Sequence, residues 1–305
     1  MVLKDPVALR LHPSDNIAVA CSPLSCGKHH LGHDGDQVQG IHPTFNGLLG
    51  ARARISPFVH NTPVLTCATL NQMLGASLYF KCENFQKAGA FKSRGATNAV
   101  MSLTDEEAQN GVLTHSSGNH GAALALAAKG RGIPAYIVMP QDAPQVKVLA
   151  AQEYGGKITF CKPSSEAREQ TAATIMRKTG AVLIHPYNDE RVIAGQGTCA
   201  MELMERIRDL DAVLAPVGGG GLLSGTAIAC KGLNPDVIVF GCEPEHADDA
   251  HRSLRAGKII PVRHPSTIAD GLRTSLGSKT FPFIKALVAD ILLASEESII
   301  AAMRL

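Results

Sequence analysis

The lysine at position 92 stands in an unusual setting, within the stretch "NFQKAGAFKSRGATNAV" and directly after Phe91. Residues 91–103 have the pattern of a helix, so Lys92 would lie in its first turn. Because the N-terminal end of a helix carries a partial positive charge, a cationic side chain is unfavourable there. The conflict disappears if the amine is neutral or bound in an imine, which is the chemistry of a lysine that forms a Schiff base. An ordinary exposed lysine is the alternative, and this motif alone does not separate the two.

A cluster of polar side chains follows an expected strand in the stretch "THSSGNHGAA", residues 114–123. Its members with hydroxyl, amide or imidazole groups are Ser116, Ser117, Asn119 and His120. Such groups at a strand-to-helix turn can anchor a ligand, and Ser117 could also relay a proton. Simple capping of the following helix is the alternative, but it would use only one of these groups. The glycines within the turn favour the ligand-binding interpretation.

Four consecutive glycines occupy the turn between another expected strand and the helix after it, in the stretch "PVGGGGLLSG". They are Gly218, Gly219, Gly220 and Gly221. Bare backbone N–H groups beside the positive end of a helix form a cradle for phosphate. A flexible turn is the alternative, but four glycines cost the folded chain too much conformational entropy to be incidental. The motif is neither a P-loop nor a G-x-G-x-x-G fingerprint.

Acidic residues gather near the end of a further strand, in the stretch "CEPEHADDA". Glu243 ends the strand, and Asp248 and Asp249 begin a helix. Several oxygen ligands close together suit a hard cation such as Mg²⁺ or Ca²⁺. Acidic capping of the helix is the alternative, and it is the better interpretation of this motif taken alone.

The lysine, its aromatic neighbour and the glycines together point to one cofactor. Pyridoxal 5′-phosphate (PLP) needs an amine that forms an imine, a cradle for its phosphate and an aromatic contact for its ring. It acts as an electron sink for a carbanion at Cα of an amino acid. The sequence therefore predicts a PLP enzyme with a small amino-acid substrate.

The composition fits this interpretation and excludes other classes of protein. The 305 residues are 45% hydrophobic and 18% charged, as in a globular protein with ample core. Basic and acidic residues are interspersed, with a net charge of +2, so we expect no nucleic-acid partner. No apolar run reaches membrane-spanning length, and the first residues make a poor signal peptide. The scattered cysteines include no CxxC motif, which indicates reduced thiols and a cytoplasmic location.

Short apolar strands alternate with helices from residue 76 onward, which predicts an α/β fold with parallel sheets. The expected strands cover residues 76–84, 111–116, 134–140, 157–163, 181–187, 211–218 and 236–244. The expected helices cover residues 91–103, 119–132, 143–155, 164–180, 195–210, 221–234 and 295–305. We expect a large PLP-binding domain, residues 46–104 and 190–305, with a small domain inserted at residues 105–189. Residues 1–45 show no sustained period and are expected to form a disordered or atypical extension.

The chain also resembles a known family, the fold type II PLP enzymes that include the serine racemases and the biosynthetic-type threonine dehydratases. The motifs that carry the resemblance lie within residues 56–305 and are "FQKAGAFKSRGA", "THSSGNHGAAL", "IAGQGT", "PVGGGGLLSG", "EPEHADDA" and "TIADGL". The stretches "LIHPYNDERVIAGQGT" and "TIADGLRTSLG" are most similar to the plant-type serine racemases. The resemblance implies a fold like that of tryptophan synthase beta, with two α/β domains and PLP between them, and a homodimer.

The resemblance further implies a role for each matching residue. Lys92 would hold PLP through an imine bond and act as one acid/base, and Ser117 would act on the opposite face. The remaining cofactor contacts would be Phe91 and Gly271 beside the ring, Asn119 at the phenolic oxygen, and Gly218, Gly219, Gly220 and Gly221 at the phosphate. The substrate-carboxylate pocket would be lined by Ser116, Ser117 and His120. The divalent cation, Mg²⁺ or Ca²⁺, would be held by Glu243, Asp249 and the Ala247 carbonyl.

The activity that the resemblance implies is interconversion of L- and D-serine, together with elimination of L-serine to pyruvate and ammonia. An L-threonine/L-serine dehydratase with the same cofactor is the close alternative. Similar chains continue past Leu305 to a Ser-Gly-Gly-Asn turn whose serine bonds the pyridine nitrogen. A truncated, catalytically impaired PLP-binding fragment is therefore a further alternative.

The nucleotide site of the animal serine racemases is matched only in part. Lys87 and Tyr154 agree with it, whereas Cys67, Ala88 and Ala122 replace polar residues. The sequence therefore leaves ATP open as an effector.

Overall fold

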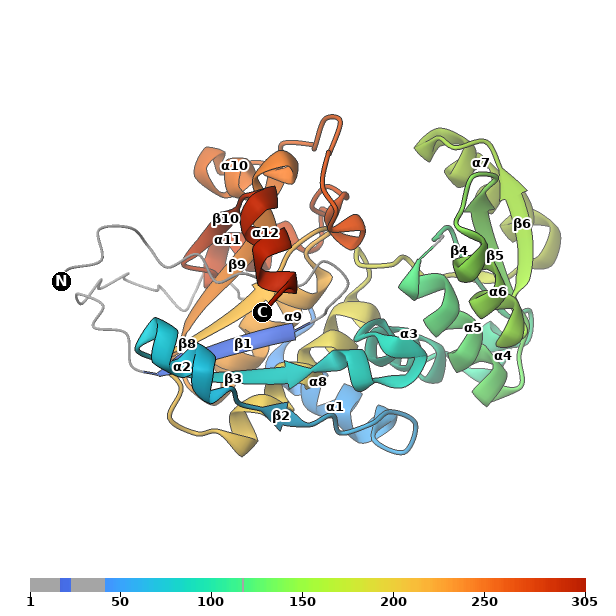
Figure 1. The fold of residues 1–305 in the computed structure, drawn as a ribbon. Helices are drawn as coiled ribbons and strands as arrows, with labels where there is room; N and C mark the ends of the chain where they lie inside the picture. Colours follow the sequence, from blue (N-terminus) through green and yellow to red (C-terminus); the bar gives the residue numbers. More distant parts are fainter. Residues whose placement is uncertain (1–16, 23–41, 117) are drawn as a thin grey trace.

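Two β-sheets at opposite ends of the molecule define the fold (Figure 1). The computed structural model describes residues 17–22, 42–116 and 118–305. Within those residues, the larger sheet has six strands and the smaller sheet has four. Helices α3 (Lys92–Met101) and α8 (Glu190–Arg206) lie between the sheets (Figure 1). The arrangement is an α/β fold, as the alternation of strands and helices predicts.

The larger sheet combines parallel and antiparallel strands. In order across the sheet they are β10 (Asp290–Ala294), β9 (Ile238–Pro244), β8 (Ala212–Pro216), β1 (Ile17–Ser22), β3 (Ser77–Cys82) and β2 (Val64–Leu65). Strands β8, β9 and β10 run parallel to one another. Strand β1 runs antiparallel to both β8 and β3, and β2 runs antiparallel to β3. The apolar runs predict β3, β8 and β9 but not β1, β2 or β10. The expected parallel pairing is present at β8, β9 and β10, whereas the antiparallel pairing of β1, β2 and β3 is not predicted, because hydrophobic periodicity reports burial and not strand direction.

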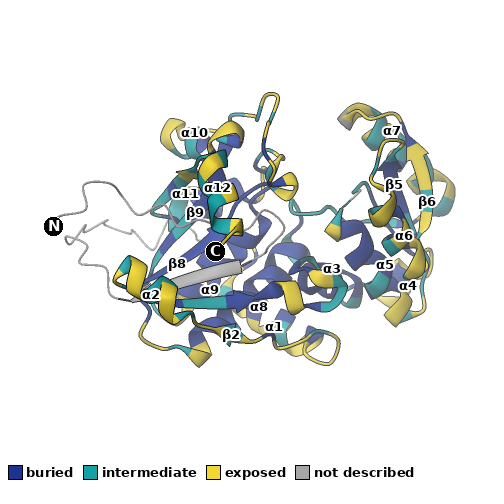
Figure 2. Ribbon diagram, viewed as in Figure 1, coloured by how far each residue is buried: buried dark blue, intermediate teal, exposed yellow. Residues whose placement is uncertain are grey.

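Both faces of the larger sheet are covered by hydrophobic cores, and β8 is buried along its whole length (Figure 2). Along β8, Val213 and Ala215 point into one core, whereas Ala212 and Leu214 point into the other, on the side of α2 (Ala68–Leu74). Successive residues of a strand face opposite ways, so a strand covered on both sides is apolar throughout. The helices of the first core are α1 (Phe45–Ile55), α8, α9 (Gly221–Leu233), α10 (Asp249–Ala256) and α11 (Phe281–Leu287).

Glycines allow α3, α8 and α9 to pack at backbone distance. A Cβ atom on Gly195 of α8 would lie 2.6 Å from the carbonyl oxygen of Arg94 in α3. A Cβ atom on Gly225 of α9 would lie 2.5 Å from the backbone nitrogen of Gly197 in α8. Only glycine leaves room for these contacts. The three helices therefore form a continuous stack with α8 in the middle.

The smaller sheet is parallel throughout. In order across the sheet its strands are β6 (Lys157–Cys161), β5 (Ala135–Pro140), β4 (Val112–Thr114) and β7 (Val182–Leu183). The alanine-rich α5 (Asn119–Arg131) packs with α3 and α6 (Gln145–Glu153) on one face, and α7 (Ser165–Thr179) covers the other. Because parallel strands end at the same edge, the segments that follow β4 and β7 come together there.

The remaining helices are short. They are α4 (Asp105–Ala108) and α12 (Glu296–Met303), with single 3-10 turns at Glu83–Phe85, Lys87–Gly89, Glu245–Ala247 and Asp270–Leu272. In the part of the chain that the structure describes, no helix is long and apolar enough to cross a membrane.

The elements predicted from residue 76 onward are present, although several ends differ. The strand expected at residues 181–187 ends at Leu183, because the chain then leaves the sheet and Pro186 has no N–H to extend the ladder. The helix expected to begin at residue 195 begins at Glu190, where the side chain of Asp189 caps its first turn.

The expected N-terminal extension, residues 1–45, lies largely outside the described residues. Within it, residues 17–22 form β1, and α1 begins at Phe45. The domain boundaries at residues 105 and 189 stay a prediction, although the smaller sheet lies between them in the sequence.

Candidate active site

Lys92 is the first residue of α3, as the sequence predicts. Its amine donates a hydrogen bond of 2.8 Å to the carbonyl oxygen of Pro186 and lies 5.1 Å from the centre of the Phe91 ring. Burial of the amine disfavours its charged form and lowers its pKa from 10.5 to about 8. Near neutral pH, far more of this amine is neutral than in an exposed lysine, which suits formation of an imine.

Residues 184–189 carry the chain from β7 to α8 across the site, and we call them the crossing segment. The Ile184 carbonyl accepts a hydrogen bond of 3.2 Å from Nε2 of His120. Two residues later, the Pro186 carbonyl accepts the hydrogen bond from the Lys92 amine. The Tyr187 ring lies directly against the glycine turn that begins α9. The crossing segment therefore joins the lysine, a buried histidine and the glycine turn.

His120 is 1% exposed, and its Nδ1 has no hydrogen-bond partner among the described residues. Burial, followed by the charge of Lys92, holds the pKa of His120 well below its ordinary value. The imidazole is therefore neutral, and because Nε2 donates to Ile184, Nδ1 is an acceptor. A buried polar atom without a partner is costly. Nδ1 thus marks a position where a ligand or a water could supply a hydrogen-bond donor.

Two further histidines line the same region beside the crossing segment. The His185 ring meets the rings of His115 and Tyr187 edge to face, with centroid distances of 5.3 Å and 4.6 Å. Burial and repulsion from His115 and Lys92 lower the pKa of His185 to about 4. Burial also lowers the pKa of His115. These imidazoles therefore stay uncharged at physiological pH.

The four glycines form the turn between β8 and α9, and Gly221 is the first residue of the helix. Gly220 adopts a φ of +88°, which glycine reaches without strain. The hydroxyl of Thr280 donates a hydrogen bond of 2.8 Å to the Gly219 carbonyl and so holds the turn in place. Among the described residues, the N-cap Gly220 offers no side chain to the first amides of α9, so these donors suit an anion such as phosphate.

Tyr187 and Gly271 border the glycine turn. A Cβ atom on Gly219 would lie 2.2 Å from Cγ of Tyr187, so the ring occupies the space that a side chain would need. A Cβ atom on Gly218 would lie 3.1 Å from the carbonyl oxygen of Gly271. The structure thus brings Gly271 beside the glycine turn, although the two stretches are distant in the sequence.

The serine-rich turn precedes α5, whose first two residues are Asn119 and His120. Ser116 is half-buried, and its hydroxyl accepts a bond of 3.4 Å from the N–H of Gly118. Asn119 is exposed at the start of the helix. Ser117, expected as the second acid/base, lies outside the described residues.

Glu243 and Asp249 are 2% and 1% exposed. Burial raises the pKa of Glu243 to about 8 and that of Asp249 to about 7. Backbone N–H groups donate to both carboxylates, but Oδ1 of Asp249 has no partner within the described ranges. The buried Ala247 lies in the turn between the two. Among the described residues, no three His, Cys, Asp or Glu side chains gather around one point, so a cation here would also need backbone oxygens or water.

The two expected nucleotide contacts lie on different elements. Lys87 belongs to the short turn ahead of α3, and its carbonyl accepts a hydrogen bond from the Ser93 hydroxyl. Tyr154 ends α6 and is half-buried.

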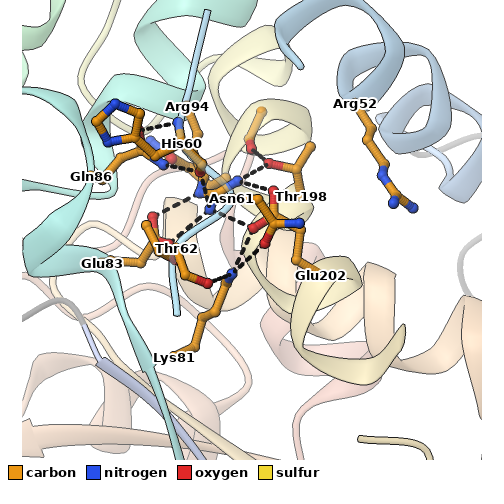
Figure 3. Close-up of polar contacts among 12 residues, drawn as sticks. Arg52, His60, Asn61, Thr62, Lys81, Glu83, Gln86, Arg94, Thr198 and Glu202 are labelled. Atoms are coloured by element: carbon orange, nitrogen blue, oxygen red, sulfur yellow. Dashed lines mark hydrogen bonds and ion pairs between the residues drawn. The ribbon is translucent and has the colours of Figure 1, made fainter. Parts of the chain in front are cut away.

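A buried network of charged side chains lies behind α3 (Figure 3). Arg94, two residues after Lys92, is 0% exposed and pairs with Glu83 and Glu202, each at 2.7 Å. The amine of Lys81 pairs with Glu202 at 2.6 Å. Two positive and two negative groups therefore balance within the protein interior, as buried charges require. The network ties the first turn of α3 to β3 and to α8.

Sequence reasoning missed this network and the crossing segment, although signals for both exist. Lys81 and Glu83 are charged residues within and directly after a mostly apolar strand, where an unpaired charge would be costly. The run "HPYND" places polar groups directly after a strand of a parallel sheet, where ligand sites form.

Known proteins resemble this chain over most of its length. The model of the pyridoxal-phosphate dependent enzyme family matches residues 55–305. The serine racemase of Arabidopsis thaliana is 53% identical over 255 residues, which cover 84% of this chain and 77% of the relative. The β-hydroxyaspartate dehydratase of Paracoccus denitrificans is 52% identical over 263 residues, which cover 86% of this chain and 84% of the relative. The structure of maize serine racemase matches with a TM-score of 0.85 at 48% identity, covering 86% of this chain and 80% of the maize chain. This chain therefore belongs to the pyridoxal-phosphate dependent enzyme family, with the α/β architecture of fold type II.

Proposed function

We propose that this chain is a PLP-dependent serine racemase that interconverts L- and D-serine and also converts L-serine to pyruvate and ammonia. Serine racemases from plants, Dictyostelium discoideum and mouse are 48–53% identical to it, which supports the proposal. The structural observation that carries the proposal is the buried Lys92 amine, whose pKa is about 8 and which shares the crossing segment with the glycine turn.

The residues of the site fit PLP. When bound, PLP supplies an electron sink for the negative charge that develops at Cα of the amino acid. The neutral amine of Lys92 would attach the cofactor, and the glycine turn with the first amides of α9 would bind its phosphate. The other contacts in this proposal are Phe91 and Gly271 on the two sides of the ring and Asn119 at the phenolic oxygen.

Racemisation needs an acid/base on each face of Cα, because a proton leaves from one side and returns from the other. Lys92 would serve one face and Ser117 the other. Ser116, Ser117 and His120 would line the pocket for the substrate carboxylate. Since Nδ1 of His120 is an acceptor, it would bind a hydroxyl or ammonium group there rather than the carboxylate itself.

The proposal includes a divalent cation, Mg²⁺ or Ca²⁺, at Glu243, Asp249 and the Ala247 carbonyl. Two buried carboxylates with raised pKa values support this assignment, and Oδ1 of Asp249 has no hydrogen-bond partner among the described residues. A homodimer is proposed from the family resemblance alone. Binding of ATP near Lys87 and Tyr154 stays an open part of the proposal.

A dehydratase is the second candidate, favoured by the similarity to the Paracoccus denitrificans β-hydroxyaspartate dehydratase. The same residues would remove the proton at Cα, and the β-hydroxyl would leave before a proton returns. The substrates would then be L-threonine, L-serine or a β-hydroxylated dicarboxylic amino acid.

The two candidates differ in their products. The purified chain, loaded with PLP and Mg²⁺, is incubated separately with L-serine, L-threonine and β-hydroxyaspartate. Chiral chromatography measures D-serine, and a coupled dehydrogenase assay measures the keto acid. Formation of D-serine, absent from the Lys92→Ala variant, supports the racemase. Keto acid without D-serine removes the racemase and leaves the dehydratase, and no turnover of any substrate contradicts both.

A further inference from the structure

His185 closes a tight turn within the crossing segment. Its Nδ1 accepts hydrogen bonds from the backbone N–H of Tyr187 at 3.3 Å and from that of Asn188 at 2.9 Å. An imidazole that accepts at Nδ1 carries its proton on Nε2 when it is neutral. Through one acceptor atom, the side chain thus holds its own backbone in a bend over the next three residues.

The residues inside this turn make the contacts at both ends of the candidate site. The Pro186 carbonyl accepts the hydrogen bond from the Lys92 amine. The Tyr187 ring lies against Gly219 in the glycine turn. Because the two residues are adjacent, any change in the turn moves both contacts together.

Asn188, the last residue of the turn, bonds to the loop that precedes α11. Its Oδ1 accepts a bond of 2.7 Å from the N–H of Lys279, and its Nδ2 donates to the Ser278 hydroxyl at 3.2 Å. The same loop carries Thr280, whose hydroxyl holds the Gly219 carbonyl. The turn is therefore anchored to the loop that supports the glycine turn and is not a loose linker.

Burial and neighbouring groups keep His185 neutral, which is the form that can accept both hydrogen bonds of the turn. Burial comes first, and His115 and Lys92 add to it in lowering the pKa to about 4, while Asp189 acts in the opposite direction. If Nδ1 were protonated, its N–H would face the backbone N–H groups of Tyr187 and Asn188. Both hydrogen bonds that Nδ1 now accepts would then be lost.

We propose that His185 is a positioning residue that sets the placement of the Lys92 amine relative to the glycine turn, and hence the affinity of the chain for PLP. The inference rests on the proposed function, in which these two features bind the cofactor. His185 acts through Pro186 and Tyr187 and needs no contact of its own with PLP.

Two variants separate the acceptor atom of His185 from its ring. His185→Asn keeps an acceptor oxygen at about the reach of Nδ1 but loses the ring. His185→Phe keeps the ring contacts with His115 and Tyr187 but loses the acceptor. The dissociation constant of PLP, measured by equilibrium dialysis without substrate, should rise about tenfold in the Phe variant and stay within about threefold in the Asn variant. The Asn variant should have the lower thermal stability of the two, because it loses the packing of the ring.

At saturating PLP, the Phe variant should also lose about tenfold in kcat for serine with little change in KM, since the turn positions the lysine and not the substrate pocket. His185→Gln, whose amide reaches past the Nδ1 position, replaces the Phe variant if that variant does not fold, with the same expected loss.

The inference is overturned if the variants without the acceptor bind PLP as tightly as the unchanged chain. It is also overturned if the Asn and Phe variants lose affinity equally, because a purely structural role would affect both. The predicted order of PLP affinities in a chain that does not turn over serine would support the inference and contradict only the proposed activity. An unchanged chain that binds no PLP would contradict both.

Discussion

The amine of Lys92 donates its hydrogen bond to the carbonyl oxygen of Pro186, a residue 94 positions further along the chain. The contact fastens the start of α3 to the crossing segment. A carbonyl can only accept, so the bond uses one N–H of the neutral amine and leaves its lone pair free to attack a carbonyl compound. Burial favours the neutral amine, which is the form that the proposed imine formation requires.

The lowered pKa of Lys92 predicts the pH dependence of its attachment to PLP. Only the neutral amine attacks the aldehyde, so the rate should rise with pH up to about 8 and level off above it. An exposed lysine would continue to gain rate beyond about pH 10. Timed borohydride reduction of the chain mixed with PLP, followed by peptide mass mapping, measures this rate.

The Lys92→Ala variant is the control for this labelling experiment. It should keep its thermal stability, lose the pyridoxyl label at position 92 and lose at least about a hundredfold in serine turnover. A pyridoxyl label that falls mainly on another lysine of the unchanged chain would show that the attachment site is wrong.

Replacement of Gly219 should harm both stability and cofactor binding. In Gly219→Ala the new methyl group meets the Tyr187 ring, and the free energy of unfolding in urea should fall by about 1–3 kcal/mol. Gly130→Ala in α5 is the matched control, because the nearest atom to its Cβ is 4.0 Å away, and it should be neutral or stabilising by up to about 1 kcal/mol. Equal effects of the two substitutions would argue against close packing of Tyr187 on the turn.

Two glutamates of α8 should differ sharply in their contribution to stability. Glu202 is 9% exposed and pairs with Arg94 and Lys81, so Glu202→Gln leaves buried cations poorly compensated and should cost about 3–5 kcal/mol (Figure 3). Glu205 pairs with Arg52 at the surface, and Glu205→Gln should cost at most about 1 kcal/mol. Urea unfolding of both variants measures the difference, and similar costs would mean that the inner network is dispensable.

A divalent cation should stabilise the chain through Glu243 and Asp249. At about one hundred times its dissociation constant, Mg²⁺ or Ca²⁺ should add about 2.7 kcal/mol to the free energy of unfolding. Glu243→Gln should abolish this response, whereas Glu245→Gln, an exposed neighbour, should keep it. Thermal unfolding with added cation or with a chelator measures the effect. A response that survives Glu243→Gln would place the cation elsewhere.

The sequence predicts those parts of the site that depend on a single segment. The first turn of a helix explains the position of Lys92, and the turn chemistry of glycine explains the start of α9. The end of an apolar strand likewise places Glu243. In each case the local period and the adjacent residues carry enough information to position the side chain.

Contacts between distant segments could not be predicted in this way. The bond from Lys92 to Pro186 and the pair of Arg94 with Glu202 depend on how α3 meets residues about a hundred positions away. The position of β1 between β8 and β3 is likewise set by pairing with strands far along the chain, and residues 17–22 have no sustained period of their own. No local sequence pattern encodes these long-range contacts, because they follow from the packing of the whole fold.

The stack of α3, α8 and α9 makes contact through backbone atoms at its glycines, so no change of side-chain rotamer can loosen it. Lys92 begins the first of these helices, and the glycine turn begins the last. The stack therefore acts as a spacer of fixed width between the Lys92 amine and the glycine turn that we propose binds the phosphate. Any movement of the smaller sheet with α6 and α7 would therefore leave the separation between Lys92 and the glycine turn unchanged.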